Sequence, residues 1–451
     1  SKCSVPKRLQ ITETVRRYQS IDKITAQITE KKPQLKELLT EKLDKVLVHK
    51  FWGYVVFLLI LLMIFQGVFF LAEYPMTWIE DFFTWLSLFS GEHLPEGPIN
   101  SLVSSGIIPG IGGIIVFAPQ IGILLYFLYL LEDSGYMARV VFLMDRMLRP
   151  FGLNGKSIVP LVSGTACAIP AIMSTRNIEN VKERLITILV TPFMTCSARL
   201  PIYSIIIGLI IPDNNFLGIK YRAIALMIMY LLGFLMALIS SFILKSFIKT
   251  KIKSFLVMDL PTYKMPVFGY DFKLVLGKVC EFISGAGKVI FTVSIILWAL
   301  SYFGPSQHKD EILATDSSLD HSYLGRIGRT MEPAIAPLGY DWKMGIGILT
   351  SFAAREVFVG TLSTLYSLDD EAPEGKLIEK MRLDVKPNGE KVFSFATGVS
   401  ILIFYAFAMQ CISTIAVVYR ETKSLKWTML QTISMTLLAY FSAFIFYQIL
   451  K

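Results

Sequence analysis

Three cysteines lie inside apolar segments, beside polar residues and near residues that interrupt helices. Cys167 stands in G-T-A-C-A-I-P, Cys196 in F-M-T-C-S-A-R-L-P and Cys411 in F-A-M-Q-C-I-S-T. Thiolate and thioether ligands select soft or borderline transition metals over Mg²⁺ or Ca²⁺. We therefore predict a transition-metal path with these sulfurs as ligands. Further candidate ligands beside them are Met194, Ser197, Gln410 and Glu356. A cysteine in a helix is also often a small apolar packing residue, and that alternative stays open.

Charged residues also fall within the apolar segments. Arg199, Arg355 and Glu356 are costly at membrane depth, where such residues line a pathway or pair with one another. We expect Glu356 to pair with Arg199. Both an ion pair that holds the structure together and a direct role in gating are consistent with the pattern.

Long apolar runs must position these side chains. Of the 451 residues 53% are hydrophobic and only 18% are charged, and Phe51–Leu71 carries no charge. About 20 apolar residues span a bilayer core as a helix. Comparable runs lie near residues 106–131, 185–211, 221–244, 283–303, 394–419 and 427–449. The sequence predicts an all-α polytopic membrane protein in contact with the lipid bilayer.

The charges of the loops predict an orientation. Basic residues collect in cytoplasmic loops, which also accounts for the net charge of +9 without a nucleic-acid partner. The basic stretches predicted inside are 1–50, 135–184, 245–280 and 420–426, and the acidic or short stretches predicted outside are 73–99, 212–219 and 304–325. The loop 367–392 is mixed, so the side of the C-terminus stays open.

An internal repeat organises the chain. Residues 136–169 align with residues 323–356 at a constant offset of 187. The ungapped identities are Tyr136/Tyr323, Arg139/Arg326, Met144/Met331, Pro150/Pro337, Gly152/Gly339 and Lys156/Lys343, and upstream Gly110-x-Gly112 faces Gly285-x-Gly287. The loop charges place the first copy inside and the second outside. This is an inverted-topology repeat, which predicts a substrate site at the repeat interface near the bilayer midplane.

Each copy continues into an interrupted apolar stretch. Pro160, Gly164 and Pro170 divide Ser157–Thr175 into pieces too short to span. Non-helical backbone at membrane depth is tolerated where it lines a cavity or is buried in protein. We predict a re-entrant hairpin that turns near residues 164–167, with Gly164 and Pro170 as gating positions. The second stretch, residues 344–366, is either a hairpin or a broken span.

Five stretches carry a resemblance to a known family. They are G-Y-M-A-R-V-V-F-L-M-D-R (135–146), G-L-N-G-K-S-I-V-P-L (152–161), C-A-I-P-A-I-M-S-T-R (167–176), T-C-S-A-R-L-P-I-Y (195–203) and F-A-A-R-E-V-F-V-G-T-L (352–362). From about residue 10 to its end the chain resembles the membrane part of the ferrous iron transport protein B (FeoB) family. Its repeats resemble that family's two Gate domains, which also occur in nucleoside-permease relatives.

The resemblance implies uptake of Fe²⁺ across the bacterial inner membrane through Cys167, Cys196 and Cys411. It also implies a GTP-binding G-protein domain ahead of a segment such as R-Y-Q-S-I-D-K-I (17–24), so this chain, which begins with Ser, is expected to be a fragment without a catalytic site or cofactor of its own. Small cytoplasmic accessory proteins are further expected partners, and a homo-oligomer stays open. The hairpin has Ala168 where the family often has Asn, which removes one oxygen ligand.

The expected domains are a cytoplasmic basic segment (1–50), a first transmembrane helix with an external amphipathic segment (51–99), a first Gate repeat (100–244), a basic linker (245–282) and a second Gate repeat (283–451). Other functions are alternatives, including an intramembrane enzyme or a signalling receptor. Transport of another metal such as manganese, or of an organic solute such as a nucleoside, is compatible with the repeats. An intramembrane metalloprotease would need an H-E-x-x-H helix, and none of the four histidines lies in a span.

Overall fold

The structure is a computed structural model of the 451-residue chain. It describes residues 7–28, 35–95, 97–211, 215–216, 219–248, 262–264, 268–304, 322–352, 355, 357–366, 374–384, 391–409 and 411–451. Nearly all of these residues are helical, and six helical stretches are long and apolar enough to cross a membrane. A seventh apolar helix, Ile290–Tyr302, is shorter and falls on the run predicted at residues 283–303. The described residues thus form a polytopic helical membrane protein.

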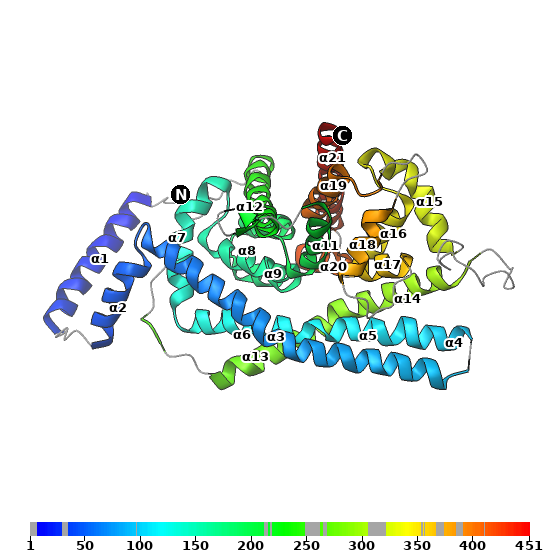
Figure 1. The fold of residues 1–451 in the computed structure, drawn as a ribbon. Helices are drawn as coiled ribbons and strands as arrows, with labels where there is room; N and C mark the ends of the chain where they lie inside the picture. The colour runs from blue at the N-terminus through cyan, green and yellow to red at the C-terminus, as the bar shows by residue number, and fades with distance from the viewer. Residues whose placement is uncertain are drawn as a thin grey trace, which may run out of the picture.

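The N-terminal part is a pair of helices followed by one very long helix (Figure 1). These are α1 (Lys7–Ile28), α2 (Leu35–Leu47) and α3 (Trp52–His93). At 1.5 Å per residue the 42 residues of α3 extend for about 63 Å. One helix, which passes through Pro75, covers most of the stretch 51–99, for which a first transmembrane helix and an external amphipathic segment were predicted.

The first half of the membrane unit contains many short helices. They are α4 (Pro98–Ser101), the π-helical η1 (Leu102–Ile107), α5 (Ile108–Ile115), α6 (Phe117–Asp133), α7 (Tyr136–Leu148), η2 (Arg149–Phe151), η3 (Gly155–Ser157), α8 (Ile158–Gly164), α9 (Ala168–Ser174), η4 (Thr175–Asn177), α10 (Val181–Val190), η5 (Thr191–Phe193), η6 (Ser197–Arg199) and α11 (Leu200–Ile210). Two antiparallel strands of two residues each, β1 (Asn215–Phe216) and β2 (Ile219–Lys220), lead into α12 (Tyr221–Phe247).

The second half repeats this plan. Its elements are α13 (Phe268–Phe282), the π-helical η7 (Ile283–Gly287), α14 (Lys288–Tyr302), α15 (Tyr323–Ile335), η9 (Ala336–Leu338), α16 (Trp342–Ser351), α17 (Val357–Leu365), α18 (Glu374–Leu383), α19 (Phe395–Phe407), α20 (Ile412–Thr422) and α21 (Leu425–Leu450).

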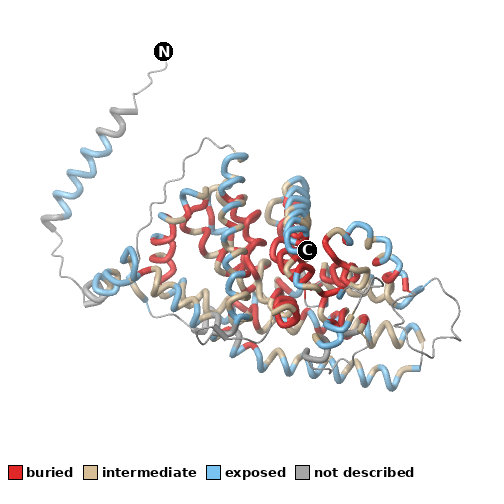
Figure 2. Tube along the Cα trace, turned by 45° about the horizontal axis from the view of Figure 1, so that its top comes forward, coloured by how far each residue is buried: buried red, intermediate tan, exposed pale blue. Residues whose placement is uncertain are grey.

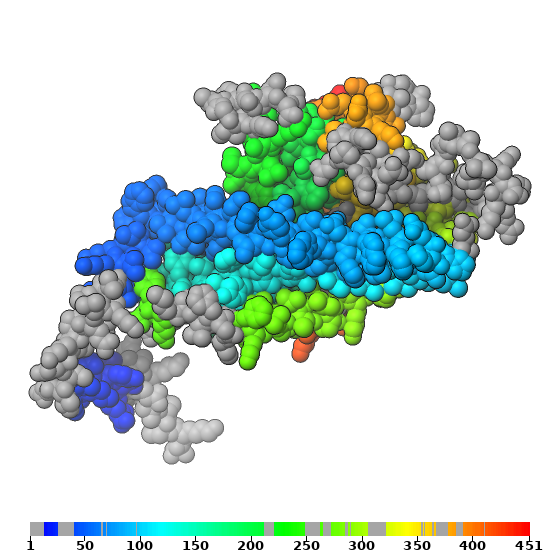
Figure 3. Space-filling view, turned by 60° about the horizontal axis from the view of Figure 1, so that its bottom comes forward, coloured from blue at the N-terminus to red at the C-terminus, as the bar shows by residue number. Residues whose placement is uncertain are grey.

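The helices form a central core and an outer layer. α3 lies across one face of the molecule beside α5 and α6, and α13 and α14 lie along the other side of α5 and α6 (Figure 3). Within the best apolar window of each span, 67% of the residues of Val181–Ile210 and 76% of those of Phe395–Thr422 are buried, against 12–22% in the other spans. Figure 2 shows the same contrast between the buried centre and the largely exposed α3 and α21. The two interrupted spans are therefore the core.

The repeat found in the sequence is also a repeat of local structure. Both copies begin with a 13-residue helix, α7 and α15, followed by a three-residue 3-10 turn. A glycine in the left-handed region comes next, Gly152 (φ 84°) and Gly339 (φ 88°), a conformation that other residues rarely adopt. The next helical turn is capped by a side-chain oxygen, Asn154 to the Ser157 N–H at 3.1 Å and Asp341 to the Met344 N–H at 2.9 Å. All of these positions keep the offset of 187.

The bases of the two hairpins lie at opposite ends of α21. Its 26 residues extend for about 39 Å. Glu421, just ahead of α21, accepts hydrogen bonds from Arg176 and Arg184 at the base of the first hairpin. At the other end of α21, Tyr447 packs against Gly339, and the Tyr440 hydroxyl donates to the Ala334 carbonyl at 2.8 Å. The predicted inverted topology is therefore confirmed.

The loop charges did not assign a side of the membrane to the C-terminus or to the stretch 367–392, and these contacts bear on both. Arg176, Arg184 and Arg420 come from two stretches predicted inside, and all three lie in one ionic cluster at the start of α21. On the orientation that the loop charges predict, α21 runs from the inner side to the outer side. Within the stretch 367–392, helix α18 lies on the side predicted as outer, since Arg382 donates to the Gly208 carbonyl at 3.3 Å, near the end of α11.

Candidate metal path

The first hairpin folds as its prolines and glycine predict. α8 and α9 have seven residues each, about 10 Å, and pack against each other around a turn at residues 165–167. Cys167 has extended backbone (φ −152°, ψ 132°) and precedes the first residue of α9. Gly164 lets the hairpin approach the next span, because a Cβ there would lie 3.2 Å from Thr191 and 3.3 Å from Met194. Pro170 is buried in α9. The predicted hairpin and its turn are confirmed.

The second stretch is a hairpin as well, which the sequence left open. α16 has ten residues and α17 has nine, and the two pack against each other. Thr361 donates to the Thr350 hydroxyl at 3.0 Å, and a Cβ at Gly347 would lie 2.8 Å from the ring of Phe358. Of the turn between them the structure describes Phe352 and Arg355, whereas Glu356 lies outside the described residues.

The two core spans are broken at their centres, each next to a cysteine. α10 and η5 are separated from η6 and α11 by extended residues that end at Cys196 (φ −90°, ψ 163°). α19 is separated from α20 by a break that runs from Ala408 (ψ 137°) to Cys411 (φ −154°, ψ 108°). Broken helices of this kind are where transporters of inverted-repeat architecture place their binding sites.

Each break is tied to the hairpin of its own copy by an equivalent bond. Ser197, the residue after Cys196, donates its backbone N–H to the Ala166 carbonyl at 3.3 Å and its hydroxyl to the same oxygen at 2.9 Å. Ile412, the residue after Cys411, donates its N–H to the Phe352 carbonyl at 3.0 Å. The bond to Ala166 places Cys196 beside the hairpin turn that carries Cys167.

Two arginines join the first copy to the second. Arg355, from the second hairpin, donates to the Cys196 sulfur at 3.5 Å and to the Ala408 carbonyl at 3.3 Å. Arg199 donates to the same Ala408 carbonyl at 3.5 Å and to the Pro192 carbonyl at 3.2 Å. Arg199 is fully buried and Arg355 is 7% exposed. The three cysteines therefore belong to one junction, in which the two breaks and both hairpin turns meet.

The electrostatics of the junction oppose a bound dication in this conformation. Two guanidinium groups converge on the Ala408 carbonyl, and Arg199 also donates to the carbonyls of Pro192, Phe193 and Met194. Like charges repel strongly where little water screens them. The predicted Arg199–Glu356 pair and the predicted ligand Gln410 fall outside the described residues, so both stay predictions.

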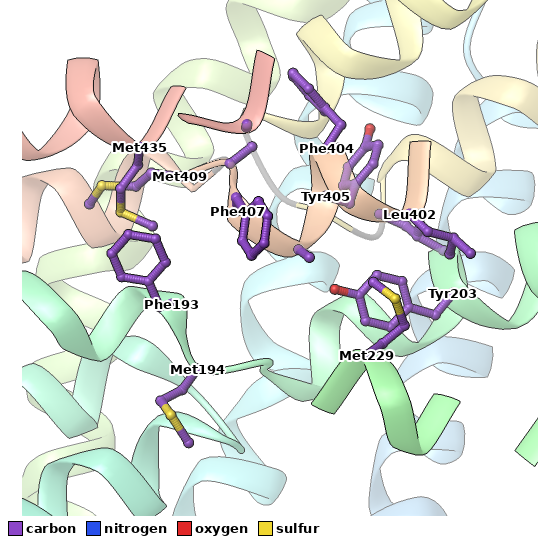
Figure 4. Packing of buried hydrophobic residues seen from close by; sticks show 14 of the residues in the cluster. Phe193, Met194, Tyr203, Met229, Leu402, Phe404, Tyr405, Phe407, Met409 and Met435 are labelled. Carbon is purple, nitrogen blue, oxygen red and sulfur yellow. The ribbon is translucent and has the colours of Figure 1, made fainter. Parts of the chain in front are cut away.

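Methionine side chains near the junction pack in the core. Met194 is buried and points away from Met409 and Met435, which lie side by side near Phe193 (Figure 4). The Thr432 hydroxyl lies 3.9 Å from the Met409 sulfur. Sequence reasoning missed Ser413, two residues after Cys411, which is fully buried and whose hydroxyl has no hydrogen-bond partner among the described residues. Its proximity to Cys411 in the sequence was the only signal.

The described residues contain no group of three or more His, Cys, Asp or Glu side chains that could hold a metal ion. Within the described ranges the cysteines at the junction form no disulfide, and each is half-buried. Conduction requires sites that a cation enters readily and leaves again. A path with few ligands at each step has that property, whereas a closed tetrahedral cage does not.

An ionic cluster closes the inner end of the molecule. The Glu421 side chain is 4% exposed and binds Arg176 and, at 3.0 Å, Arg184. Glu281, on α13, accepts from Arg420 at 3.0 Å and from Lys278 at 3.1 Å. The hydrogen bond to Glu421 raises the pKa of Arg176. The cluster thus connects the base of the first hairpin with the end of the second broken span.

Comparison with known proteins agrees with this architecture. A Gate profile described as "Nucleoside recognition" matches residues 114–210 and 283–425, one match in each half. A profile described as "Ferrous iron transport protein B C terminus" matches residues 226–276. The chain belongs to the FeoB family. The two Gate matches contain the two repeat copies, whereas the domain boundaries proposed from the sequence stay predictions.

Curated FeoB relatives match over nearly the whole chain. The Fe(2+) transporter FeoB of Leptospira biflexa is 46% identical over 413 residues, and that of Leptospira interrogans serovar copenhageni is 44% identical over 419 residues. A Fe(2+) transport protein A/Fe(2+) transporter FeoB fusion protein of Porphyromonas gingivalis is 36% identical over 448 residues. These matches cover 91–92% of the chain but only 52–60% of the relatives. No solved structure matches the chain.

Proposed function

We propose that this chain forms the path by which Fe²⁺ crosses the bacterial inner membrane into the cytoplasm. The observation that carries the proposal is the junction, where the two hairpin turns and the two helix breaks bring Cys167, Cys196 and Cys411 into one region. Sulfur ligands suit a borderline cation such as Fe²⁺. The names of the FeoB relatives, all Fe(2+) transporters, support the same substrate.

The junction supplies two kinds of ligand to a passing cation. The broken helices leave backbone carbonyls without helical partners, and the cysteines add sulfur. In the present conformation Arg199 and Arg355 occupy the Ala408 carbonyl, and Arg355 also occupies the Cys196 sulfur. A cation enters once these guanidinium groups withdraw. Glu356, Gln410 and Ser197 are the proposed oxygen ligands, Met194 is a sulfur ligand only if its side chain turns inward, and Gly164 and Pro170 are the proposed flexible points.

Movement of one copy against the other would expose the junction alternately to each side, as in other inverted-repeat transporters. We propose that the energy comes from a G-protein domain that binds GTP and is joined ahead of α1. Small accessory proteins are further proposed partners, in keeping with the relative that is fused to Fe(2+) transport protein A.

Uptake into liposomes that contain the purified chain tests the substrate. Fe²⁺ is offered under reducing conditions, with Mn²⁺, Zn²⁺ and radiolabelled adenosine in parallel and protein-free liposomes as the control. We expect uptake of Fe²⁺ down its gradient and none of adenosine. Uptake of Mn²⁺ in preference to Fe²⁺ would assign the path to manganese. Uptake of adenosine alone would favour the nucleoside function in the description of the Gate profile.

A further inference from the structure

The arginine that the repeat places in both copies has two different environments. Arg139 on α7 and Arg326 on α15 stand at the same position of equivalent helices. Arg139 is 1% exposed, whereas Arg326 is exposed to solvent. The repeated structure alone would give both arginines the same exposure, so the burial of Arg139 has a cause outside the repeat.

That cause is a contact with two segments that belong to neither copy. Asp44 of α2 accepts from Arg139 through both oxygens, Oδ1 from Nε at 3.0 Å and Oδ2 from Nη2 at 3.1 Å. Tyr263, in the linker between the copies, donates its hydroxyl to Asp44 Oδ1 at 2.8 Å, and the Arg139 guanidinium lies 4.3 Å from its ring centroid. A two-point arginine–carboxylate pair fixes orientation as well as distance.

The protonation of Asp44 is consistent with a persistent pair. Burial raises the pKa of Asp44, but the hydrogen bonds from Arg139 and Tyr263 outweigh it, so the pKa lies below its ordinary value. Asp44 is therefore charged at neutral pH.

From Arg139 a continuous set of contacts leads to the junction. Asp145, later on α7, accepts from the Gly155 N–H at 2.9 Å, and a Cβ at Gly155 would lie 2.1 Å from the Val141 carbonyl, so α7 sits directly on the base of the first hairpin. The hairpin turn in turn holds Ser197, next to Cys196, through the Ala166 carbonyl. A displacement of α7 thus reaches the sulfur through packed backbone.

We propose that Asp44 and Arg139 are positioning residues that couple helix α2 to the first hairpin and so control access to Cys196 from the inner side. Among the described residues no carboxylate pairs with Arg326, the equivalent residue of the second copy. The inference deepens the proposed function and rests on it for its meaning in transport.

Thiol labelling tests the coupling without iron. The full chain is placed in inside-out membrane vesicles and treated with a membrane-impermeant maleimide, and the rate of modification of each cysteine is followed by peptide mass spectrometry. Cys280 on α13 is exposed and serves as the internal reference. The variants are Asp44→Asn, which keeps the size of the side chain, the conservative Asp44→Glu, and Arg326→Gln as the matched control on the second copy.

We expect Asp44→Asn to label Cys196 about tenfold faster, the change that corresponds to losing one charged hydrogen bond of about 1.4 kcal/mol. Cys280 should keep its rate, and Asp44→Glu and Arg326→Gln should label Cys196 at close to the rate of the parent chain. An unchanged Cys196 rate in Asp44→Asn would overturn the inference, and so would an equal rise at Cys280, which would mean general loosening. A selective rise at Cys196 in a chain that moves no iron would leave the coupling intact and refute the proposed function instead.

Discussion

The two repeat copies have the same local structure but differ in the segments to which they are attached. Both have the 13-residue helix, the left-handed glycine, the capped turn and the bond from a break to a hairpin turn. The first copy is attached through Arg139 to α2 and the linker, whereas the second is attached at the opposite end through Gly339 to α21 and through Lys343 to Asp384. The shared local structure builds the junction, and the two copies are attached to different parts of the chain.

Sulfur is also divided unequally between the copies. The first copy contributes Cys167 in its hairpin and Cys196 at its break. The second contributes Cys411, and its register places Ala354 opposite Cys167. Two of the three junction cysteines therefore belong to the first copy and one to the second.

The glycine pair gives the largest expected difference. A Cβ at Gly339 would lie 2.3 Å from the ring of Tyr447, whereas at Gly152 it would meet the flexible Lys245 side chain at 2.8 Å. The left-handed backbone costs both alanine variants about 1–2 kcal/mol, and overpacking adds about 1–3 kcal/mol at the rigid site. Gly339→Ala should therefore lower the midpoint of thermal unfolding well below that of Gly152→Ala. Equal midpoints would show that the two turns are packed alike.

The next largest effect is expected at the inner ionic cluster. Glu421→Gln removes the charge that Arg176 and Arg184 share, at a cost of about 1–3 kcal/mol for a buried charged acceptor. We expect lower thermal stability and faster labelling of Cys196 from the inner side. Glu179→Gln is the matched control, because Glu179 pairs with Lys156 on the same surface but is 89% exposed. Similar behaviour of the two variants would contradict a closing role for the cluster.

The repeated lysines should show the smallest difference. Lys343 binds Asp384 at 3.1 Å, with both side chains mostly buried, and lies 4.5 Å from the ring of Tyr366. Lys343→Met should lower the free energy of unfolding by about 1 kcal/mol. Lys156→Met breaks only a solvated pair and should leave it unchanged. A larger loss for Lys156→Met would reverse the assignment of the tighter attachment to the second copy.

Local sequence predicted the elements that contain their own signals. Apolar runs gave the spans, Pro160, Gly164 and Pro170 gave the first hairpin, and loop charges with the repeat gave the inverted topology. Helix α3 passes through Pro75 without ending there, because other contacts hold it.

The break before Cys411 could not be predicted, because F-A-M-Q-C contains neither Pro nor Gly. The bond that a helix would form from the Ile412 N–H to the Ala408 carbonyl is replaced at both ends. The N–H donates to Phe352, and the carbonyl accepts from Arg199 and Arg355. The partners lie 53 to 209 residues away along the chain, so only the tertiary fold creates the break. The side of the C-terminus likewise depended on the long-range contacts of Glu421.

Fe²⁺ uptake by cysteine variants tests the central claim most directly. The single variants Cys167→Ser, Cys196→Ser and Cys411→Ser and the triple variant are compared in liposomes with Cys280→Ser, which lies outside the junction. We expect the triple variant to fall below about a tenth of the parent rate, a loss typical of disturbed metal sites. Cys280→Ser should keep the full rate, and mercurials should block only chains that retain junction cysteines. Full uptake by the triple variant would contradict the account and show that these cysteines are packing residues.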